Sequence, residues 1–353
     1  MLQTNLLAPG HADLVTHLTY DFYGERLATC SADQHIKIFR RSVDGQWDLE
    51  SDWKAHDAPL LRVSFAHPLH GSLLASCSHD RTVRIWEEPS GSSSKENRWI
   101  ERAVLAGPRG SVRAVEFSPP NPSYGLRVAS ISTDSRLRIH TSLDPDLNDW
   151  STAYDVHVPS LAAPGQSEDP PAPETNGTHD LALGGWGLSW CKEKWWGSVF
   201  AVFAGTSPVV KIIQADPTPT SLINLVPPSS PPVPLTSLAW APSCGRSYHL
   251  IATGARDGTV RIWRVEPPSP PDESGNGYED DQKRREAWSA EIVGEFGKGG
   301  ARVGMVDWNA TGTTLTTSDD DGVIRIYKPT YAKTWKLLGR ITAEEPDSET
   351  NGH

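Results

Sequence analysis

Three residue types that can form a hydrolytic triad occur close together in the sequence. They are His56, Ser78 and Asp80, and a serine activated by a carboxylate-oriented histidine is a nucleophile for acyl transfer. A similar histidine and aspartate, His11 and Asp33, stand at corresponding places earlier in the chain. Because catalytic sites are not usually duplicated in register, we interpret both sets as hydrogen-bond networks that lock local structure.

A second group of residues that could carry chemistry is acidic. Carboxylates follow one another at Glu87-Glu88, at Asp319-Asp320-Asp321 and at Glu344-Glu345, as metal ligands can. They lie in expected turns without a second cluster of ligands, so solvated turns are the better interpretation. The sequence holds no phosphate-binding loop, no zinc-ligand spacing and no nucleophile elbow. We therefore predict no catalytic residues, no metal, no cofactor and no enzymatic activity.

The elements that must position these residues are short repeated strands. In the clearest copy, Leu73–Trp86, apolar and polar residues alternate on either side of His79-Asp80-Arg81-Thr82. A two-residue period predicts β-strands, and the polar residues between two such runs predict a tight turn. Six copies occur, and their turn residues are Asp33, Asp80, Asp134, Ser207, Asp257 and Asp321.

Each copy is flanked by two further expected strands. Inner strands that end in an aromatic residue precede the copies, at 14–20, 61–65, 112–117, 186–190, 235–240 and 303–308. An outer strand marked by a tryptophan follows in five of the six copies. Four strands per unit, at spacings close to the roughly 40–45-residue period of a propeller blade, predict an all-β, six-bladed β-propeller. A Lys or Arg stands four positions after every turn residue, and we expect it to reach a neighbouring blade or solvent.

The composition predicts one domain with insertions. We expect a single propeller over 1–342 and a disordered acidic tail over 343–353. Segments rich in proline and acid cannot bury a core, so we expect disordered insertions near 159–180, 217–234 and 266–286. Within the second of these, Ser221–Leu225 is apolar and is expected to supply the outer strand of the fourth unit.

Charge and cysteine usage exclude other classes of protein. The net charge is -11 and the pI about 5.5, which argues against a surface for nucleic acid. Four cysteines cannot form a disulfide framework for 353 residues, and we expect Cys30 and Cys77 to be buried apolar side chains. No secretory signal and no membrane-spanning apolar run is found, so we expect a protein peripheral to membranes in a reducing compartment.

At the turns and strand ends, the sequence resembles the WD-repeat propeller family. The unit of that family carries a Gly-His pair, a turn aspartate and a terminal Trp-Asp. The turn aspartate is present in five units, and the terminal tryptophan in two. The residues that we assign to the turn and blade networks are His11, Asp33, His56, Ser78, Asp80, Trp86, Asp134, Asp257, Trp263 and Asp321.

The resemblance narrows to two sister branches: a COPII coat cage subunit, and the Seh-type nucleoporins of the Y-shaped outer-ring complex of the nuclear pore. Asp21-Phe22-Tyr23-Gly24 and Phe65-Ala66-His67-Pro68 are similar to both branches. Three stretches favour the nucleoporins: Asp80–Glu88, Gly245–His249 and Trp308–Lys336. The proline-rich insertions, and Leu60-Leu61-Arg62 where the family has an aromatic residue before its arginine, depart from the pattern.

What the resemblance implies is a structural scaffold subunit of the outer-ring complex at the nuclear envelope. Its partners would be a helical scaffold nucleoporin and other outer-ring subunits. The resemblance also implies a second role in the SEA (GATOR-type) complex, which regulates TOR signalling at the vacuolar or lysosomal membrane. Three alternatives remain open: a COPII cage subunit, a peptide-reading WD-repeat adaptor and, third, an enzyme.

The N-terminal segment bears on how the ring of blades closes. Gln3–Leu7 resembles an outer strand without a blade of its own, whereas Thr334–Ile341 already supplies the outer strand of the sixth unit. We therefore expect an open propeller with an unpaired strand edge. As the resemblance also implies, the partner would insert a three-stranded blade between the sixth and first units. The expected edge residues are Leu6, Leu7, Val15, Leu18, Val303 and Met305.

Overall fold

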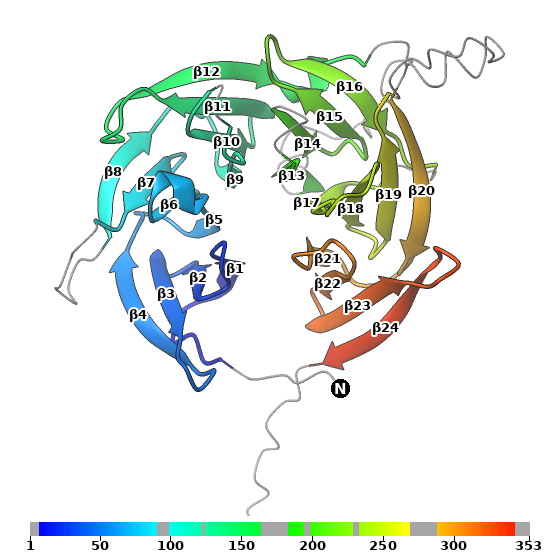
Figure 1. The fold of residues 1–353 in the computed structure, drawn as a ribbon, viewed down its shortest axis with the longest axis horizontal. Coiled ribbons are helices and arrows are strands. Elements are labelled where there is room, and N and C mark those ends of the chain that lie inside the picture. The colour runs from blue at the N-terminus through cyan, green and yellow to red at the C-terminus, as the bar shows by residue number, and fades with distance from the viewer. Residues whose placement is uncertain are drawn as a thin grey trace, which may run out of the picture. The chain divides into compact units, whose positions relative to one another are not determined.

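The structure is a computed structural model, and its secondary structure is almost entirely β-strand (Figure 1). It describes residues 7–89, 99–121, 124–163, 183–193, 198–228, 233–268 and 288–342. In these residues, 24 strands form six four-stranded antiparallel sheets, the blades of a β-propeller fold. The prediction of an all-β chain built from six four-stranded units is confirmed. The chain divides into two compact units, Met1–Val226 and Pro227–His353.

The first unit holds four sheets, in each of which the strands pair in chain order. The first two sheets are β1 (Val15–Tyr20), β2 (Arg26–Ser31), β3 (His35–Arg41) and β4 (Trp47–Lys54), then β5 (Leu60–Phe65), β6 (Leu73–Ser78), β7 (Val83–Glu87) and β8 (Ile100–Leu105). The next two are β9 (Val112–Phe117), β10 (Arg127–Ser132), β11 (Arg136–Ser142) and β12 (Trp150–His157), then β13 (Gly185–Trp190), β14 (Val199–Gly205), β15 (Val210–Gln214) and β16 (Thr220–Leu225). Two short 3-10 helices, η1 (Pro68–His70) and η2 (Val158–Ser160), complete the unit's regular structure.

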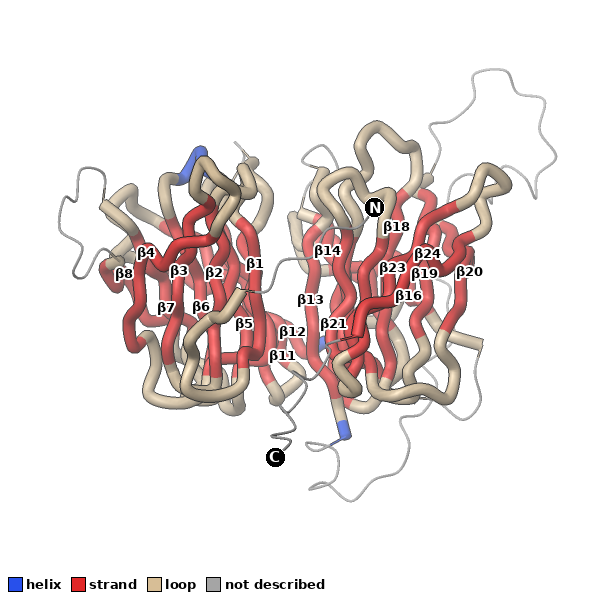
Figure 2. The backbone as a smooth tube through the Cα atoms, turned by 90° about the horizontal axis from the view of Figure 1, so that it is seen from below, coloured by secondary structure: helices blue, strands red, loops and turns tan. Residues whose placement is uncertain are grey.

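The second unit holds the fifth and sixth sheets. They are β17 (Leu235–Trp240), β18 (His249–Ala255), β19 (Val260–Glu266) and β20 (Ser289–Phe296), then β21 (Val303–Trp308), β22 (Leu315–Asp319), β23 (Val323–Pro329) and β24 (Trp335–Thr342). Figure 2 shows the strands of each sheet joined by turns at alternating ends. All six expected inner strands are confirmed to within a residue at each end, as β1, β5, β9, β13, β17 and β21.

The turn aspartates explain why the second and third strands of a sheet meet so tightly. The residue after the aspartate has positive φ, +74° at Gln34 and +70° at Arg81, which closes the turn. The carboxylates of Asp33 and Asp80 each accept the backbone N–H two residues later, at 2.9 Å in both turns. An aspartate side chain thus replaces a backbone acceptor that the turn itself cannot supply.

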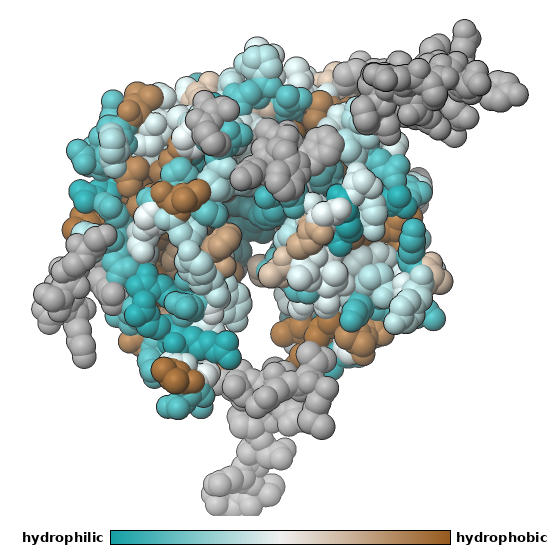
Figure 3. All heavy atoms as spheres, in the orientation of Figure 1, coloured by the Kyte–Doolittle hydropathy of each residue, from teal (hydrophilic) through white to brown (hydrophobic). Residues whose placement is uncertain are grey.

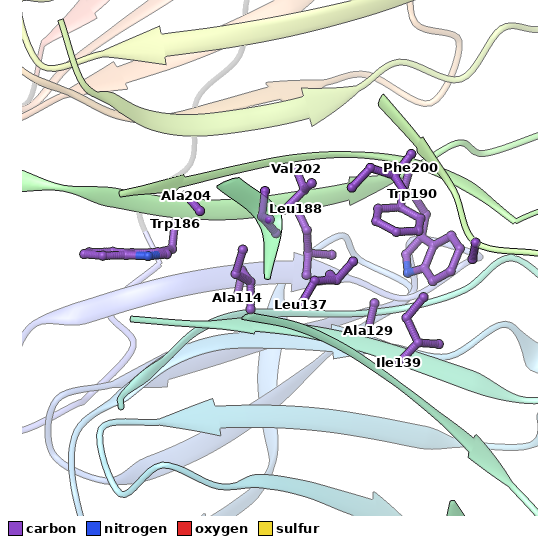
Figure 4. Packing of buried hydrophobic residues seen from close by; sticks show 14 residues of the cluster. Ala114, Ala129, Leu137, Ile139, Trp186, Leu188, Trp190, Phe200, Val202 and Ala204 are labelled. Carbon is purple, nitrogen blue, oxygen red and sulfur yellow. The ribbon is translucent and has the colours of Figure 1, made fainter. Parts of the chain in front are cut away.

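The core lies between neighbouring sheets of the same unit. Within the first unit, β1 contacts β5, β5 contacts β9 and β9 contacts β13, and within the second unit β17 contacts β21. Figure 4 shows the cluster between the third and fourth sheets, in which the rings of Trp190 and Phe200 meet edge to face at 4.9 Å. Both side chains are fully buried, so each sheet needs a neighbour to cover its apolar residues.

The proline-rich segments lie partly outside the described residues. Most of 159–180 and of 266–286, and all of the tail 343–353, fall there. The range 217–234 is not one loop, because it contains β16, which pairs with β15 as the expected outer strand of the fourth sheet. Most of the expected spare strand, Gln3–Leu7, also lies outside the described residues, and Leu7 belongs to no strand.

Candidate protein-binding faces and the networks that support them

The second sheet contains a continuous chain of buried hydrogen bonds. The Trp86 indole N–H donates to Ser76 Oγ at 2.9 Å, and Ser76 Oγ lies 2.8 Å from His56 Nε2. His56 Nδ1 lies 2.7 Å from Asp80 Oδ2. Because the carboxylate can only accept, Nδ1–H donates to it and Nε2 accepts from the serine hydroxyl. The chain ties two strands, the turn between them and the preceding loop together through side chains alone.

The serine in this chain is Ser76, not the predicted Ser78. Ser78 Oγ accepts the N–H of Asp80 at 3.2 Å and donates to the Pro59 carbonyl at 2.9 Å, so it braces the turn and touches no histidine. The difference of two positions decides which serine contacts His56. Ser76 lies inside β6, level with the Trp86 indole, whereas Ser78 is the last residue of the strand. Ser76 has 0% exposure and its oxygen is occupied by Trp86, so a substrate has no path to this Ser-His-Asp arrangement.

The first sheet repeats this network with substitutions. His11 Nδ1 lies 2.9 Å from Asp33 Oδ2, and His11 Nε2 lies 3.0 Å from Thr29 Oγ1. Thr29 therefore takes the place of Ser76, and Phe39 stands where the tryptophan would be, without a donor. A hydroxyl residue at this strand position in several repeats was the signal that could have identified Ser76 from the sequence.

In the third sheet an arginine replaces the histidine. Arg138 donates to Asp134 Oδ2 at 2.9 Å and to Ser132 Oγ at 3.0 Å. Burial alone would raise the pKa of Asp134, but the hydrogen bonds from Arg138 and Ser132 outweigh it and lower the pKa to about 2. At Asp80, likewise, burial is outweighed by the hydrogen bonds from His56 and Thr82, which hold its pKa well below the usual range.

The second unit keeps parts of the network. In the fifth sheet, Trp263 donates to Thr253 Oγ1 at 3.2 Å, and Asp257 accepts the N–H of Thr259 at 3.0 Å. In the sixth sheet the predicted Asp321 is exposed, and Asp319 instead receives the guanidinium of Arg325 at 2.5 Å. Asp319 ends β22 inside the sheet, whereas Asp321 lies beyond it in the turn, which explains the exchange.

The repeated basic residues are neither a basic ring nor extended into solvent. Lys37, Arg138, Lys211 and Arg261 are buried, and each bonds a neighbouring acid or carbonyl; for example, Arg261 Nε lies 2.8 Å from Glu295 Oε2. The expectation that each reaches a neighbouring sheet or solvent is wrong for Lys37, Arg138 and Arg261, whose acids belong to the same sheet. It is confirmed for Lys211, which bonds the Pro159 carbonyl in η2 after the third sheet. These pairs stiffen the third and fourth strands.

One face of the first sheet is apolar and exposed. Along β1, His17 and Thr19 pair with Cys30 and Ala28, which pack on the second sheet. Leu18 and Tyr20 alternate with them and point to the opposite face, where they are 43% and 53% exposed. Two further residues extend this face along β4. They are Trp47, whose ring lies 5.8 Å from that of Tyr20, and Leu49, which is 54% exposed.

The last sheet has a matching exposed face. Val306 and Trp308 pack on the fifth sheet, whereas a second row crosses the opposite face. The strand register places Met305, Ser318, Ile324 and Ile341 in this row. Ile324 is 37% exposed, and Leu338 beside the row is 61% exposed. Figure 3 shows hydrophobic atoms gathered over β23 and β24.

Only some of the predicted edge residues lie on these two exposed faces. Leu18 and Met305 lie on the exposed faces, Val15 is half-buried at the start of β1, and Leu6 lies outside the described residues. Val303 is 3% exposed and packs in the core between the fifth and sixth sheets, so it is not an edge residue. A β-bulge between Val303 and Met305 breaks the alternation and separates the two side chains.

Two features of other classes of protein are absent from the described residues. No helix in the described part of the chain is long and apolar enough to span a membrane. Within those same ranges, no three His, Cys, Asp or Glu side chains converge as a metal site would require.

Comparison with known proteins shows to which family the chain is similar. The family model described as "WD domain, G-beta repeat" matches residues 3–40, 47–87, 226–264 and 291–328. The chain is similar to Nucleoporin SEH1 of Saccharomyces cerevisiae, with 32% identity over 95% of this chain and 98% of that protein. It is also 32% identical to Nucleoporin seh1 of Schizosaccharomyces pombe, over 98% and 96%, and to human Nucleoporin SEH1, over 96% and 88%. The alignments thus cover all six sheets.

Proposed function

Because the chain belongs to the SEH1 family of WD-repeat nucleoporins, we propose that it is a structural scaffold subunit of the outer-ring complex of the nuclear pore, located at the nuclear envelope. The observation that carries this proposal is the extent of the similarity, which spans nearly the whole chain and nearly the whole of the relatives. A shared repeat alone would indicate only the fold. The role is binding rather than catalysis, since the Ser76–His56–Asp80 arrangement is enclosed in the sheet.

The partner that suits the exposed faces is a helical nucleoporin that contributes an additional blade. Elsewhere in each unit, rows of apolar residues like Met305–Ile324–Ile341 are covered by a neighbouring sheet. A blade with apolar residues on both of its faces would cover Leu18 and Tyr20 on one side and Ile324 on the other. Such an obligate interface buries on the order of 2,000 Å² or more. The remaining outer-ring subunits would bind through this assembly.

A second role, in the SEA (GATOR-type) complex that regulates TOR signalling at the vacuolar or lysosomal membrane, uses the same surface in this proposal. The support for this second role is the family resemblance. The mode of binding would be the same, because another helical subunit that contributes one blade would fit the same two exposed faces. Association with that membrane would be peripheral and carried by the partners.

Affinity purification of the tagged chain at its natural level, followed by mass spectrometry, tests the proposal. Outer-ring nucleoporins should be recovered in near-stoichiometric amounts, and a fluorescent fusion should mark the nuclear rim. Recovery of COPII coat proteins without nucleoporins would contradict the proposal in favour of the vesicle coat. Recovery of a ubiquitin ligase alone would instead indicate a peptide-reading adaptor.

A further inference from the structure

The loop that precedes β21 lacks the histidine found in the equivalent loops of the first two sheets. Residues 297–302 read Gly-Lys-Gly-Gly-Ala-Arg, whereas His56 occupies the loop before β5. The strand residue that would contact the ring is nevertheless present. Thr317 pairs with Arg325 as Ser76 pairs with Arg84, so its hydroxyl takes the position that binds His56 in the second sheet. The sixth sheet therefore keeps the hydroxyl that would contact an imidazole ring, but it has no histidine in the loop before β21.

A cavity of about 220 Å³ lies at this place. Its walls include Lys298, Gly299, Thr317, Asp319, Arg325 and Tyr327. The loop above it is held by backbone contact, because a Cβ on Gly297 would come within 2.4 Å of the Gly258 carbonyl oxygen. A Cβ on Gly299, by contrast, would meet nothing within 4 Å. The loop is thus fixed to the turn of the fifth sheet and leaves room for a guest group.

The charges beside the cavity differ from those at the same place in three of the other sheets. In three sheets the repeated basic residue stands directly opposite an acid on the outer strand, as Lys37 with Asp52, Arg138 with Asp155 and Arg261 with Glu295. In the sixth sheet the residue opposite Arg325 is Arg340. Directly opposed residues share one face of a sheet, so Arg325 and Arg340 are two like charges where three of the other sheets have an opposite-charge pair; Arg325 lines the cavity, and Arg340 stands on the neighbouring strand outside it.

Two of the three acids at this end of the sheet already have partners, and the third, Asp321, is exposed in the turn beyond β22. Asp319 is engaged by Arg325 and by the N–H of Val323, at 2.9 Å, and Asp320 is bound by Arg302 at 2.8 Å. Lys298 and Arg340 are exposed, and neither has a partner among the described residues. A carboxylate or phosphate at the cavity would therefore meet the available donors of Lys298 in the cavity wall, and its chain could reach Arg340 on the neighbouring strand.

We propose that this cavity is a binding site for a compact oxyanion presented by a peptide, either a glutamate or aspartate carboxylate or the phosphate of a phosphoserine. The planar guanidinium fork of arginine matches such groups in geometry, and the Lys298 ammonium adds a second charge. The guest supplies from another chain the acid that Asp52, Asp155 and Glu295 supply within this one. The site lies on the face of β23 turned toward the fifth sheet, so it is separate from the Met305–Ile324 row.

Peptide titration of the full chain tests the site. Three peptides of the same length carry one central glutamate, phosphoserine or glutamine, and binding is measured by calorimetry at low salt. The net charge of -11 disfavours non-specific attraction of anions, so binding of an anionic peptide reports a local site. The glutamate or phosphoserine peptide should bind and the glutamine peptide should not. The stronger of the two anions identifies the source of the guest.

Matched variants locate the binding. Arg340→Gln and Lys298→Gln change exposed residues and spare the Asp319–Arg325 pair, so the fold should survive, and each should weaken binding about tenfold, as loss of one charge-assisted hydrogen bond would. Lys336→Gln is the control, since Lys336 is exposed on the same strand and faces Lys328 in another like-charge pair away from the cavity. Absence of anion binding, equal binding of the glutamine peptide, or an equal loss in Lys336→Gln would overturn the proposal.

Discussion

His56→Ala tests whether the buried chain of hydrogen bonds stabilises the second sheet. The substitution removes a ring that is 1% exposed, together with its contacts of 2.7 Å to Asp80 and 2.8 Å to Ser76. Asp80 keeps the N–H and hydroxyl of Thr82, so its carboxylate is only partly stranded. A hydrogen bond to a charged group contributes about 1.5–3 kcal/mol, and an orphaned buried hydroxyl costs about 1–3 kcal/mol.

The expected loss is therefore about 3 kcal/mol in the free energy of unfolding, measured from urea denaturation monitored by tryptophan fluorescence. His79→Ala is the matched control, because His79 is exposed and makes a single bond of 2.9 Å to Ser111. A surface change of that kind alters stability by about 0.5 kcal/mol or less. If both variants unfold at the same urea concentration, the network contributes nothing measurable and the reasoning is wrong.

Two further outcomes are expected from titrating groups. Burial raises the pKa of the thiols of Cys30 and Cys191 to about 12, whereas Cys244 is exposed. A thiol reagent at pH 8 should therefore label Cys244 and leave the other two unlabelled until the chain unfolds. Labelling of Cys30 or Cys191 in the folded chain, located by peptide mapping, would count against their burial. The depressed pKa of Asp134 means that its contribution is complete above about pH 4 and is lost as the pH falls through about 2. Asp134→Asn should therefore cost about 1 kcal/mol at pH 6, by urea denaturation, and progressively less toward pH 2; a cost independent of pH would contradict the assignment.

Most of the fold could be predicted because its signals are local and repeated. Alternation of apolar and polar residues is set by the geometry of a strand, and an aspartate before a left-handed turn residue is set by the turn's own hydrogen bonds. Both signals recur in register from Asp33 onward, so errors in one copy are corrected by the others. Ser221–Leu225 shows the value of this: its sequence is weak, but the repeat predicts a strand there, and β16 occupies it.

The details of the networks could not be predicted in the same way, because they depend on depth and on irregularities. Ser76 and Ser78 share one face of β6, and only the level of the Trp86 indole decides which of them meets His56. Three consecutive aspartates begin at the last residue of β22, and alternation does not say which one faces the sheet. The bulge that turns Val303 into the core has no mark in the sequence.

We propose that the exposed faces of the first and last sheets bind the partner of this scaffold. Capture of partners from cells that express Ile324→Asp tests it most directly, with Val43→Asp as the control, since Val43 is fully exposed at the tip of the β3–β4 turn. We expect the outer-ring nucleoporins captured by the parent chain to be lost from Ile324→Asp and retained by Val43→Asp, while both variants remain folded by circular dichroism. Retention of the same nucleoporins by a folded Ile324→Asp chain would contradict it.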